Sequence, residues 1–294
     1  MVCDSMVQEG LKHEYQETNG ITMHYVTKGS GRLVVFLHGF PEFWYSWRHQ
    51  LSAIGSEKIK AVAPDMRGYG KTDKPEGVEN YKISILAQDI LGLIRGLGED
   101  KAVIMGHDWG GAVAWHFAQT LPEHTDKLII LNCPPPSVLK KQISDNPDQQ
   151  RRSTYIKFFQ QEKVPEKTLS ANNYSGLKMA LTSLAVKKDL FTEADLEKYV
   201  DALKLPALSC AINYYRASYQ FPPDKETEQL KVKCETMVVW GEQDNALGIE
   251  LTKQIPNFVE GELKINYVPT AGHWVQHEEP ELVNNYIRDF LNDS

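Results

Sequence analysis

The sequence predicts an α/β protein whose sheet is mostly parallel, doubly wound and covered by helices on both faces. Short, continuous apolar runs are the first observation, because strands buried on both faces of a parallel sheet are apolar at almost every position. Helical patterns between these runs are the second, because alternating strands and helices build right-handed crossovers. The apolar runs lie at residues 33–39, 60–65, 101–108, 127–132, 236–244 and 263–269. The helical patterns lie at residues 83–97, 110–120 and 278–291.

Two polar, alternating segments near the amino terminus predict an antiparallel hairpin at the edge of this sheet. The segments read EYQET and ITMHYVTKG, and Asn19-Gly20 separates them. An Asn-Gly pair favours the two-residue turn whose twist matches that of paired antiparallel strands. We therefore expect an edge hairpin that precedes the parallel strands.

The alternation of strand and helix stops between residues 134 and 223. The strings CPPP and FPP bound this interval, and only helical signals lie between them. One such signal is TEADLEKYVDAL, with Thr192 as its expected N-cap. We therefore expect a helical cap inserted after the sixth strand. The predicted division is 1–133 for the first part of the α/β core, 134–223 for the cap and 224–294 for the second part of the core.

Composition and charge describe an ordinary globular chain and exclude several classes of protein. The 294 residues are 41% hydrophobic and carry a formal net charge of −7, which argues against a nucleic-acid surface. No stretch of 18 apolar residues occurs and the first residues hold no apolar leader, so we expect no membrane anchor and a cytoplasmic location. Cys3, Cys133, Cys210 and Cys234 lie far apart without a C-x-x-C pair, which indicates neither a disulfide framework nor a zinc site.

Three reactive residues follow predicted strands, which is where ligands bind in open α/β sheets. Asp108 stands in the string GHDWG, Asp244 in GEQDN and His273 in AGHW. Their order is that of the catalytic triad in hydrolases with a G-x-S-x-G turn, where serine takes the place of Asp108. Gly106 and Gly110 permit the sharp turn that exposes such a nucleophile. Asp244 alone fits an ordinary turn and His273 an ordinary core histidine, so the conjunction with Asp108 carries the prediction of a triad.

The string HGFP at residues 38–41 adds a candidate oxyanion hole. In hydrolases of this type, a backbone N–H from the loop after an early strand acts together with the N–H that follows the nucleophile. Here those donors are the amides of Phe40 and Trp109. A tight turn is the plainer interpretation of the same string, and the two interpretations are compatible.

As a set, these motifs resemble the epoxide hydrolases of the α/β-hydrolase fold. The resemblance runs from about residue 15 to residue 291. It rests on HGFP, HDWGG, RGYGKTDKP, NYYR, AGHW and Asp244. It implies a small epoxide and water as substrates, no metal or other cofactor, and a monomer or homodimer.

The resemblance also implies roles for side chains outside the triad. Tyr155 in STYIKFFQ and Tyr215 in NYYR match the pair of cap tyrosines that activate the epoxide oxygen in this family. Adjacent helical residues point about 100° apart, so only one of Tyr214 and Tyr215 is expected to face the nucleophile, and the resemblance assigns that position to Tyr215. The side chains of Phe40, Trp109 and Trp274 are expected to contact the substrate.

An aspartate in place of the serine changes the class of reaction. A carboxylate displaces a leaving group from an sp³ carbon and becomes an ester of its own side chain. A water activated by His273 then cleaves that ester at the Asp108 carbonyl, while Asp244 orients His273 and stabilises its cation. Neither step requires a metal or an organic cofactor.

Two other interpretations remain open from the sequence. A haloalkane dehalogenase uses the same nucleophile and ester, but haloalkane dehalogenases place Asn where Phe40 stands, and fluoroacetate dehalogenases place Arg where Trp109 stands. Both departures favour an epoxide over a halide. A protein that uses this fold only to bind a ligand or partner is the other interpretation, and the complete triad argues against it.

Overall fold

The computed structural model describes residues 10–292 and contains an eight-stranded sheet. The strands are β1 Lys12–Thr18, β2 Ile21–Lys28, β3 Arg32–Leu37, β4 Ile59–Pro64, β5 Ala102–His107, β6 Thr125–Leu131, β7 Thr236–Gly241 and β8 Leu263–Val268. They lie in the order β1-β2-β4-β3-β5-β6-β7-β8. Pairing is antiparallel between β1 and β2 and between β2 and β4, and parallel from β4 to β8. The predicted, mostly parallel α/β sheet is confirmed.

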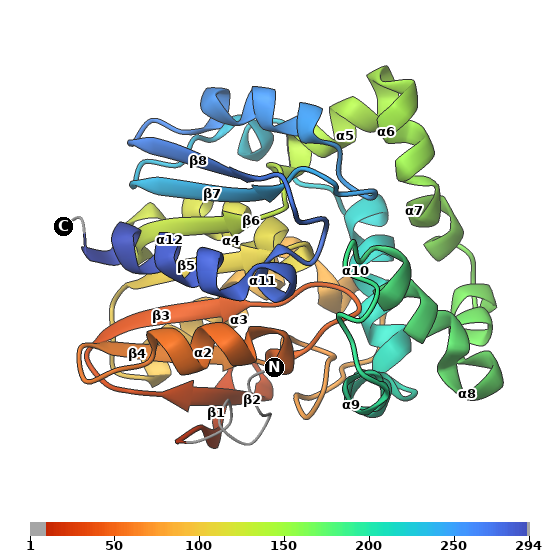
Figure 1. Cartoon of the computed structure of the whole chain (residues 1–294), viewed down its shortest axis with the longest axis horizontal. Coiled ribbons are helices and arrows are strands. Elements are labelled where there is room, and N and C mark those ends of the chain that lie inside the picture. The colour runs from red at the N-terminus through yellow and green to blue at the C-terminus, as the bar shows by residue number, and fades with distance from the viewer. Residues whose placement is uncertain (1–9, 293–294) are drawn as a thin grey trace.

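Helices cover both faces of the sheet (Figure 1). The helices are α2 Arg48–Ile54, α3 Ile83–Gly96, α4 Trp109–Thr120, α5 Pro136–Asp145, α6 Pro147–Arg152, α7 Thr154–Phe159, α8 Val164–Ser183, α9 Glu193–Leu203, α10 Ala207–Gln220, α11 Val275–Glu278 and α12 Pro280–Asn292. Along β3, Val35 and Leu37 pack with α3 and α4, whereas Val34 and Phe36 pack with α2 and α12. Burial on both faces explains why this strand is apolar at consecutive positions.

The edge hairpin forms as expected. Thr18 pairs with Ile21, so Asn19 and Gly20 make the two-residue turn between β1 and β2. Both turn residues have positive φ, 45° for Asn19 and 76° for Gly20. Asn and Gly adopt this conformation more readily than other residues, which is the reason that the pair favours the turn.

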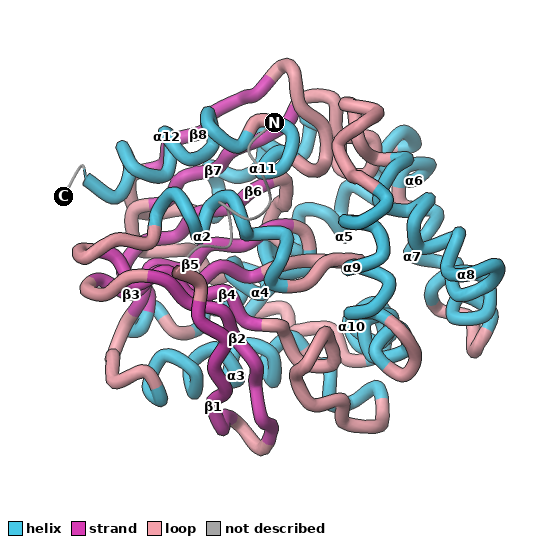
Figure 2. Tube along the Cα trace, turned by 60° about the horizontal axis from the view of Figure 1, so that its bottom comes forward, coloured by secondary structure: helices cyan, strands magenta, loops and turns pink. Residues whose placement is uncertain are grey.

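The predicted helical insertion after the sixth strand is confirmed, since α5 to α10 all lie between β6 and β7 in the chain. Figures 1 and 2 agree that these helices lie together beyond one end of the sheet, the end toward which the parallel strands point. Thr192 caps α9 as predicted, because its side chain accepts from the Asp195 N–H and the Asp195 side chain accepts from the Thr192 N–H.

The structure corrects some element boundaries. The last predicted helix, 278–291, corresponds to α12, which begins at Pro280 because a separate short helix, α11, ends at Glu278. The helix α2 and the 3₁₀ helix η5, Ile249–Phe258, were not predicted. The helix α2 has only seven residues and η5 contains Pro256, so neither segment carries the long, uninterrupted pattern that predicts a helix.

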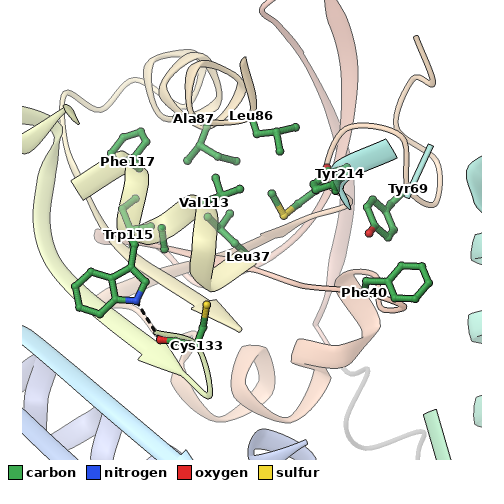
Figure 3. Close-up of a cluster of buried hydrophobic side chains, with 14 of the residues drawn as sticks. Leu37, Phe40, Tyr69, Leu86, Ala87, Val113, Trp115, Phe117, Cys133 and Tyr214 are labelled. Atoms are coloured by element: carbon green, nitrogen blue, oxygen red, sulfur yellow. Dashed lines mark hydrogen bonds between the residues drawn. The ribbon is translucent and has the colours of Figure 1, made fainter. Parts of the chain in front are cut away.

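The cluster in Figure 3 joins the core to the carboxyl end of the sheet. Trp115 is fully buried in α4, and its indole N–H donates to the Cys133 carbonyl at 3.1 Å. Cys133, Cys210 and Cys234 are free thiols, while Cys3 lies outside the described residues. Within residues 10–292, no helix has the length and apolar character needed to cross a membrane.

The direction of the strand order reverses at β3. This strand has β4 on one side and β5 on the other, although β4 and β5 both come later in the chain. The loops that leave β3 and β5 therefore diverge at the carboxyl ends of the strands, which is the position where ligands bind in open α/β sheets. The string HGFP begins the connection after β3, and GHDWG spans the turn from the end of β5 to the start of α4.

Candidate active site

Asp108 lies on a strained turn between β5 and α4. Its backbone has φ 50° and ψ −122°, a conformation that costs a residue other than glycine roughly 1–3 kcal/mol. The turn needs its glycines for space: a Cβ at Gly106 would collide with the Gly110 carbonyl, and one at Gly110 would collide with the Leu37 carbonyl. Glycine at both positions therefore permits the close approach of backbones that shapes this turn.

The structure brings the three predicted triad residues together. His273 Nδ1 lies 2.8 Å from Asp244 Oδ2, and His273 Nε2 lies 3.7 Å from Asp108 Oδ2. The side chains of His273 and Asp244 are buried, while that of Asp108 is 12% exposed. One imidazole therefore stands between two carboxylates, and only the carboxylate of Asp108 retains appreciable exposure.

The electrostatics of His273 follow from this arrangement. Burial disfavours the charged imidazolium, but the charges of Asp244 and Asp108 outweigh burial and raise the pKa of His273 well above its ordinary value. For Asp244, burial acts in the opposite direction, yet the cationic His273 holds the pKa of Asp244 below its usual range. A change in the charge of Asp108 would therefore change the proton affinity of His273.

Asp244 is held by groups that the sequence did not reveal. Its Oδ1 accepts from the backbone N–H groups of Ala246 and Leu247 at 2.7 and 2.9 Å. Its Oδ2 accepts from Asn132 Nδ2 at 2.8 Å. Asn132 directly follows β6 and has a positive φ of 38°. A polar residue at the end of the apolar run KLIILN was the only local signal of this contact.

The loop after β3 reaches the nucleophile candidate. The Phe40 N–H donates to Asp108 Oδ1 at 2.8 Å. A Cβ at Gly39 would collide with the Asp108 side chain, so glycine permits this close approach. Trp109 is the first residue of α4, and the N–H groups of a first helical turn have no intrahelical partner. Of the two predicted oxyanion donors, the Phe40 N–H therefore contacts the Asp108 side chain, and the Trp109 N–H belongs to the next residue in the chain.

Glu42 connects the loops of the site and was missed by the sequence analysis. This fully buried carboxylate accepts from the Gly39 N–H at 2.9 Å and lies 2.7 Å from His107 Nδ1. The other ring nitrogen of His107 lies 2.7 Å from the His273 carbonyl oxygen. Burial opposes ionisation of Glu42, but His107 outweighs it and keeps the pKa of Glu42 well below its usual range. An acidic residue among the aromatic residues of FPEFW was the available signal.

Tyr155 and Tyr215 lie on different helices and pack against each other, with Tyr215 beside Trp109. Tyr155 is in α7 and Tyr215 in α10, with their ring centroids 5.9 Å apart. Burial, followed by the negative charge of Asp108, raises the pKa of both phenols, so both stay protonated at neutral pH. The neighbouring Tyr214 faces another way, since its hydroxyl donates to the Arg67 carbonyl at 2.8 Å.

The three residues expected to contact substrate lie in two different places. Phe40 and Trp109 flank Tyr215, with ring centroids 5.5 and 5.1 Å from it. Trp274 is fully buried behind His273, with ring centroids 4.7 Å apart, and its indole N–H donates to the Leu181 carbonyl at 2.8 Å. The position of Trp274 fits support of His273 rather than contact with a substrate.

Among residues 10–292, no group of three or more His, Cys, Asp or Glu side chains is arranged to hold a metal ion. The candidate site offers a carboxylate on a turn, an imidazole and two phenols, which are groups able to act as nucleophile, base and proton donors.

Comparisons with known proteins identify the family. Residues 32–280 match the family model of the alpha/beta hydrolase fold. The AB hydrolase superfamily protein YfhM of Bacillus subtilis (strain 168) is 41% identical over 290 residues, 96% of this chain and 99% of the relative. Epoxide hydrolase 1 of Caenorhabditis elegans is 41% identical over 294 residues, 97% of this chain and 72% of the relative.

Solved structures agree with the sequence relatives. A crystal structure of Bacillus megaterium epoxide hydrolase in complex with an inhibitor matches with a TM-score of 0.87 and 34% identity, over 95% of this chain and 100% of that one. The chain therefore belongs to the α/β-hydrolase fold family. The resemblance to epoxide hydrolases that rested on HGFP, HDWGG and AGHW is confirmed by these relatives.

Proposed function

We propose that this protein hydrolyses epoxides to vicinal diols through an ester on Asp108. The observation that carries the proposal is a carboxylate on the nucleophile turn, 3.7 Å from His273 and 2.8 Å from the Phe40 N–H. A carboxylate on this turn suits displacement at an sp³ carbon, whereas a serine suits attack on an acyl carbon. The names of the relatives point to the same substrate class.

Ring opening is the first half-reaction. Asp108 Oδ2 attacks one epoxide carbon, the carbon–oxygen bond of the ring breaks, and the released oxygen takes a proton from Tyr155 or Tyr215. The raised pKa of each phenol keeps the proton in place until an alkoxide forms. The step leaves an alkyl ester on Asp108 and one tyrosinate.

Ester hydrolysis is the second half-reaction. Esterification removes the charge of Asp108, so the pKa of His273 falls and its proton returns through solvent to the tyrosinate. Neutral His273 then takes a proton from water, and the hydroxide attacks the Asp108 carbonyl carbon. The amides of Phe40 and Trp109 stabilise the oxyanion. When the intermediate collapses, the leaving diol oxygen takes the proton of the new carboxylic acid, which restores the Asp108 carboxylate. His273 keeps the proton that it took from water, so protons balance over the cycle.

The helices α5 to α10, within residues 134–223, act in this proposal as a cap over the site. They carry both tyrosines and also contribute Phe159, whose ring centroid lies 5.2 Å from that of Phe40 and 4.7 Å from that of Tyr215. These aromatic rings favour an apolar substituent on the epoxide and help to exclude bulk water from the ester.

A substrate panel tests the proposed function. We expect styrene oxide, aliphatic epoxides or fatty-acid epoxides to yield vicinal diols, measured by chromatography. Haloalkanes serve as the control, because they require the same nucleophile but a different leaving group. Release of chloride or bromide without any diol formation from the epoxides would replace this function with dehalogenation.

Replacement of both cap tyrosines tests the proton donors. Tyr155→Phe or Tyr215→Phe should slow ester formation about 10-fold, and the double variant about 10²–10⁴-fold, because the alkoxide loses its acid. Hydrolysis of a preformed ester should change little. Single-turnover measurements separate the two rates.

Tyr214→Phe is the matched control for this experiment. It removes a hydroxyl that donates to the Arg67 carbonyl, so ester formation should proceed at the wild-type rate. If the Tyr155→Phe/Tyr215→Phe variant also opens epoxides at the wild-type rate, the proton comes from another group.

A further inference from the structure

Gln149 is a buried amide that joins two parts of the site far apart in the sequence. It lies in α6, and its side chain is only 2% exposed. Its Nε2 donates to the Ala246 carbonyl at 2.9 Å, and its Oε1 accepts from the Gly248 N–H at 3.0 Å. Gln149 therefore clamps the backbone on both sides of Leu247, in the loop after β7.

This loop carries Asp244. The amides that orient the Asp244 carboxylate belong to Ala246 and Leu247, and both residues lie within or beside the segment that Gln149 holds. Arg152, at the end of the same helix, adds a contact, since its Nη1 donates to the Asp244 carbonyl at 2.7 Å. The position of the triad acid thus depends on α6.

The same amide also reaches the helix that carries Tyr155. Gln149 Nε2 donates to Ser153 Oγ at 2.9 Å. Ser153 is the N-cap residue of α7, and Tyr155 follows two residues later. One side chain is therefore bonded both to the acid loop and to the start of the tyrosine helix.

We propose that Gln149 is a positioning residue that fixes the positions of Asp244 and Tyr155 relative to each other. Without its amide, the buried Ala246 carbonyl and the half-buried Gly248 N–H would lose their partner, so the acid loop would shift to regain hydrogen bonds. A displacement of about 1 Å near reacting groups lowers a rate by up to about 10²-fold. The kinetic consequence rests on the proposed function, whereas the structural consequence does not.

Gln149→Met tests the inference, because methionine keeps the volume of the side chain and removes its hydrogen bonds. Three quantities are measured: the rates of ester formation and ester hydrolysis in single turnovers, hydrogen exchange of the Ala246 and Leu247 amides, and the melting temperature. We expect both rates to fall about 10-fold or more and both amides to exchange faster. Gln150→Met, at the exposed neighbouring position, should change none of the three.

The pattern of defects distinguishes positioning from direct catalysis. Asp244→Asn should slow only ester hydrolysis and Tyr155→Phe only ester formation, whereas Gln149→Met should slow both. Wild-type rates together with wild-type amide exchange in Gln149→Met would overturn the proposal. If wild-type protein turns over no epoxide, the proposed function fails, while amide exchange still decides the role of Gln149.

A second variant covers the case in which Gln149→Met does not fold. Arg152 is 23% exposed at its side chain, so Arg152→Met disturbs the core less while it removes the bond to the Asp244 carbonyl. We expect slower ester hydrolysis and faster exchange of the Ala246 and Leu247 amides. Wild-type behaviour of Arg152→Met beside an unfolded Gln149→Met would reduce Gln149 to a packing residue and overturn the proposal.

Discussion

Replacement of Asp108 by alanine is expected to lower epoxide turnover roughly 10⁴-fold or more, as removal of a triad nucleophile does in other hydrolases. The carboxylate is the only group in the proposal that forms a bond to the substrate carbon. Its side chain is 12% exposed and belongs to neither hydrophobic core cluster, so the core should keep its packing. Turnover and the melting temperature are the two measurements.

Asp100→Ala is the matched control, since Asp100 is an exposed aspartate just before β5 begins. It should leave both turnover and melting temperature unchanged. In the wild-type protein, a single turnover in heavy-oxygen water should place the label in the peptide that contains Asp108, because water attacks the ester at the Asp108 carbonyl. Label found only in the diol, and never in that peptide, would exclude an ester intermediate.

The second large effect is expected from His273→Gln, which should form the ester and then stall. His273 has no part in the first displacement, but it activates the water of the second step, a contribution of about 10²–10⁴-fold for a general base. Intact-mass measurement after mixing with excess epoxide should therefore find protein plus one substrate. Asp244→Asn should be impaired in the same step, because the imidazole loses its orientation and its counter-charge.

His124→Gln provides the control for a histidine elsewhere in the chain. His124 lies in the 3₁₀ helix η3, Pro122–His124, which precedes β6 at the opposite end of the sheet. This variant should accumulate no ester and should turn over epoxide at the wild-type rate. Normal turnover by His273→Gln would mean that another group activates the water.

Much of the fold was predictable because its determinants are local. Strands such as β3 are apolar at consecutive positions since both of their faces are buried, and Asn19-Gly20 specifies its turn through backbone preference alone. The capping residues of α9 lie within one turn of each other. By contrast, α2 is stabilised by packing of Leu51 and Ile54 on the sheet, and no capping residue marks its start.

The candidate triad was predictable for a related reason. Asp108, Asp244 and His273 each follow a strand, and parallel strands end at one edge of a sheet, so position along the chain already implied proximity in space. Residues that support the triad from loops or helices have no such marker. Asn132 and Asp244 are separated by 112 residues, and Glu42 and His107 by 65.

The sequence by itself determined the layered fold, the helical insertion and the order of the reactive residues. These features depend on apolar periodicity and turn preferences, which arise from interactions among a few neighbouring residues. Tertiary structure alone decided which side chains support them. In the folded chain, Trp274 packs against His273, Glu42 lies within hydrogen-bonding distance of His107, and Gln149 lies between the loop that carries Asp244 and the start of α7. Each of these contacts depends on burial and hydrogen bonding between distant segments, and no local preference distinguishes one partner from another before the chain has folded.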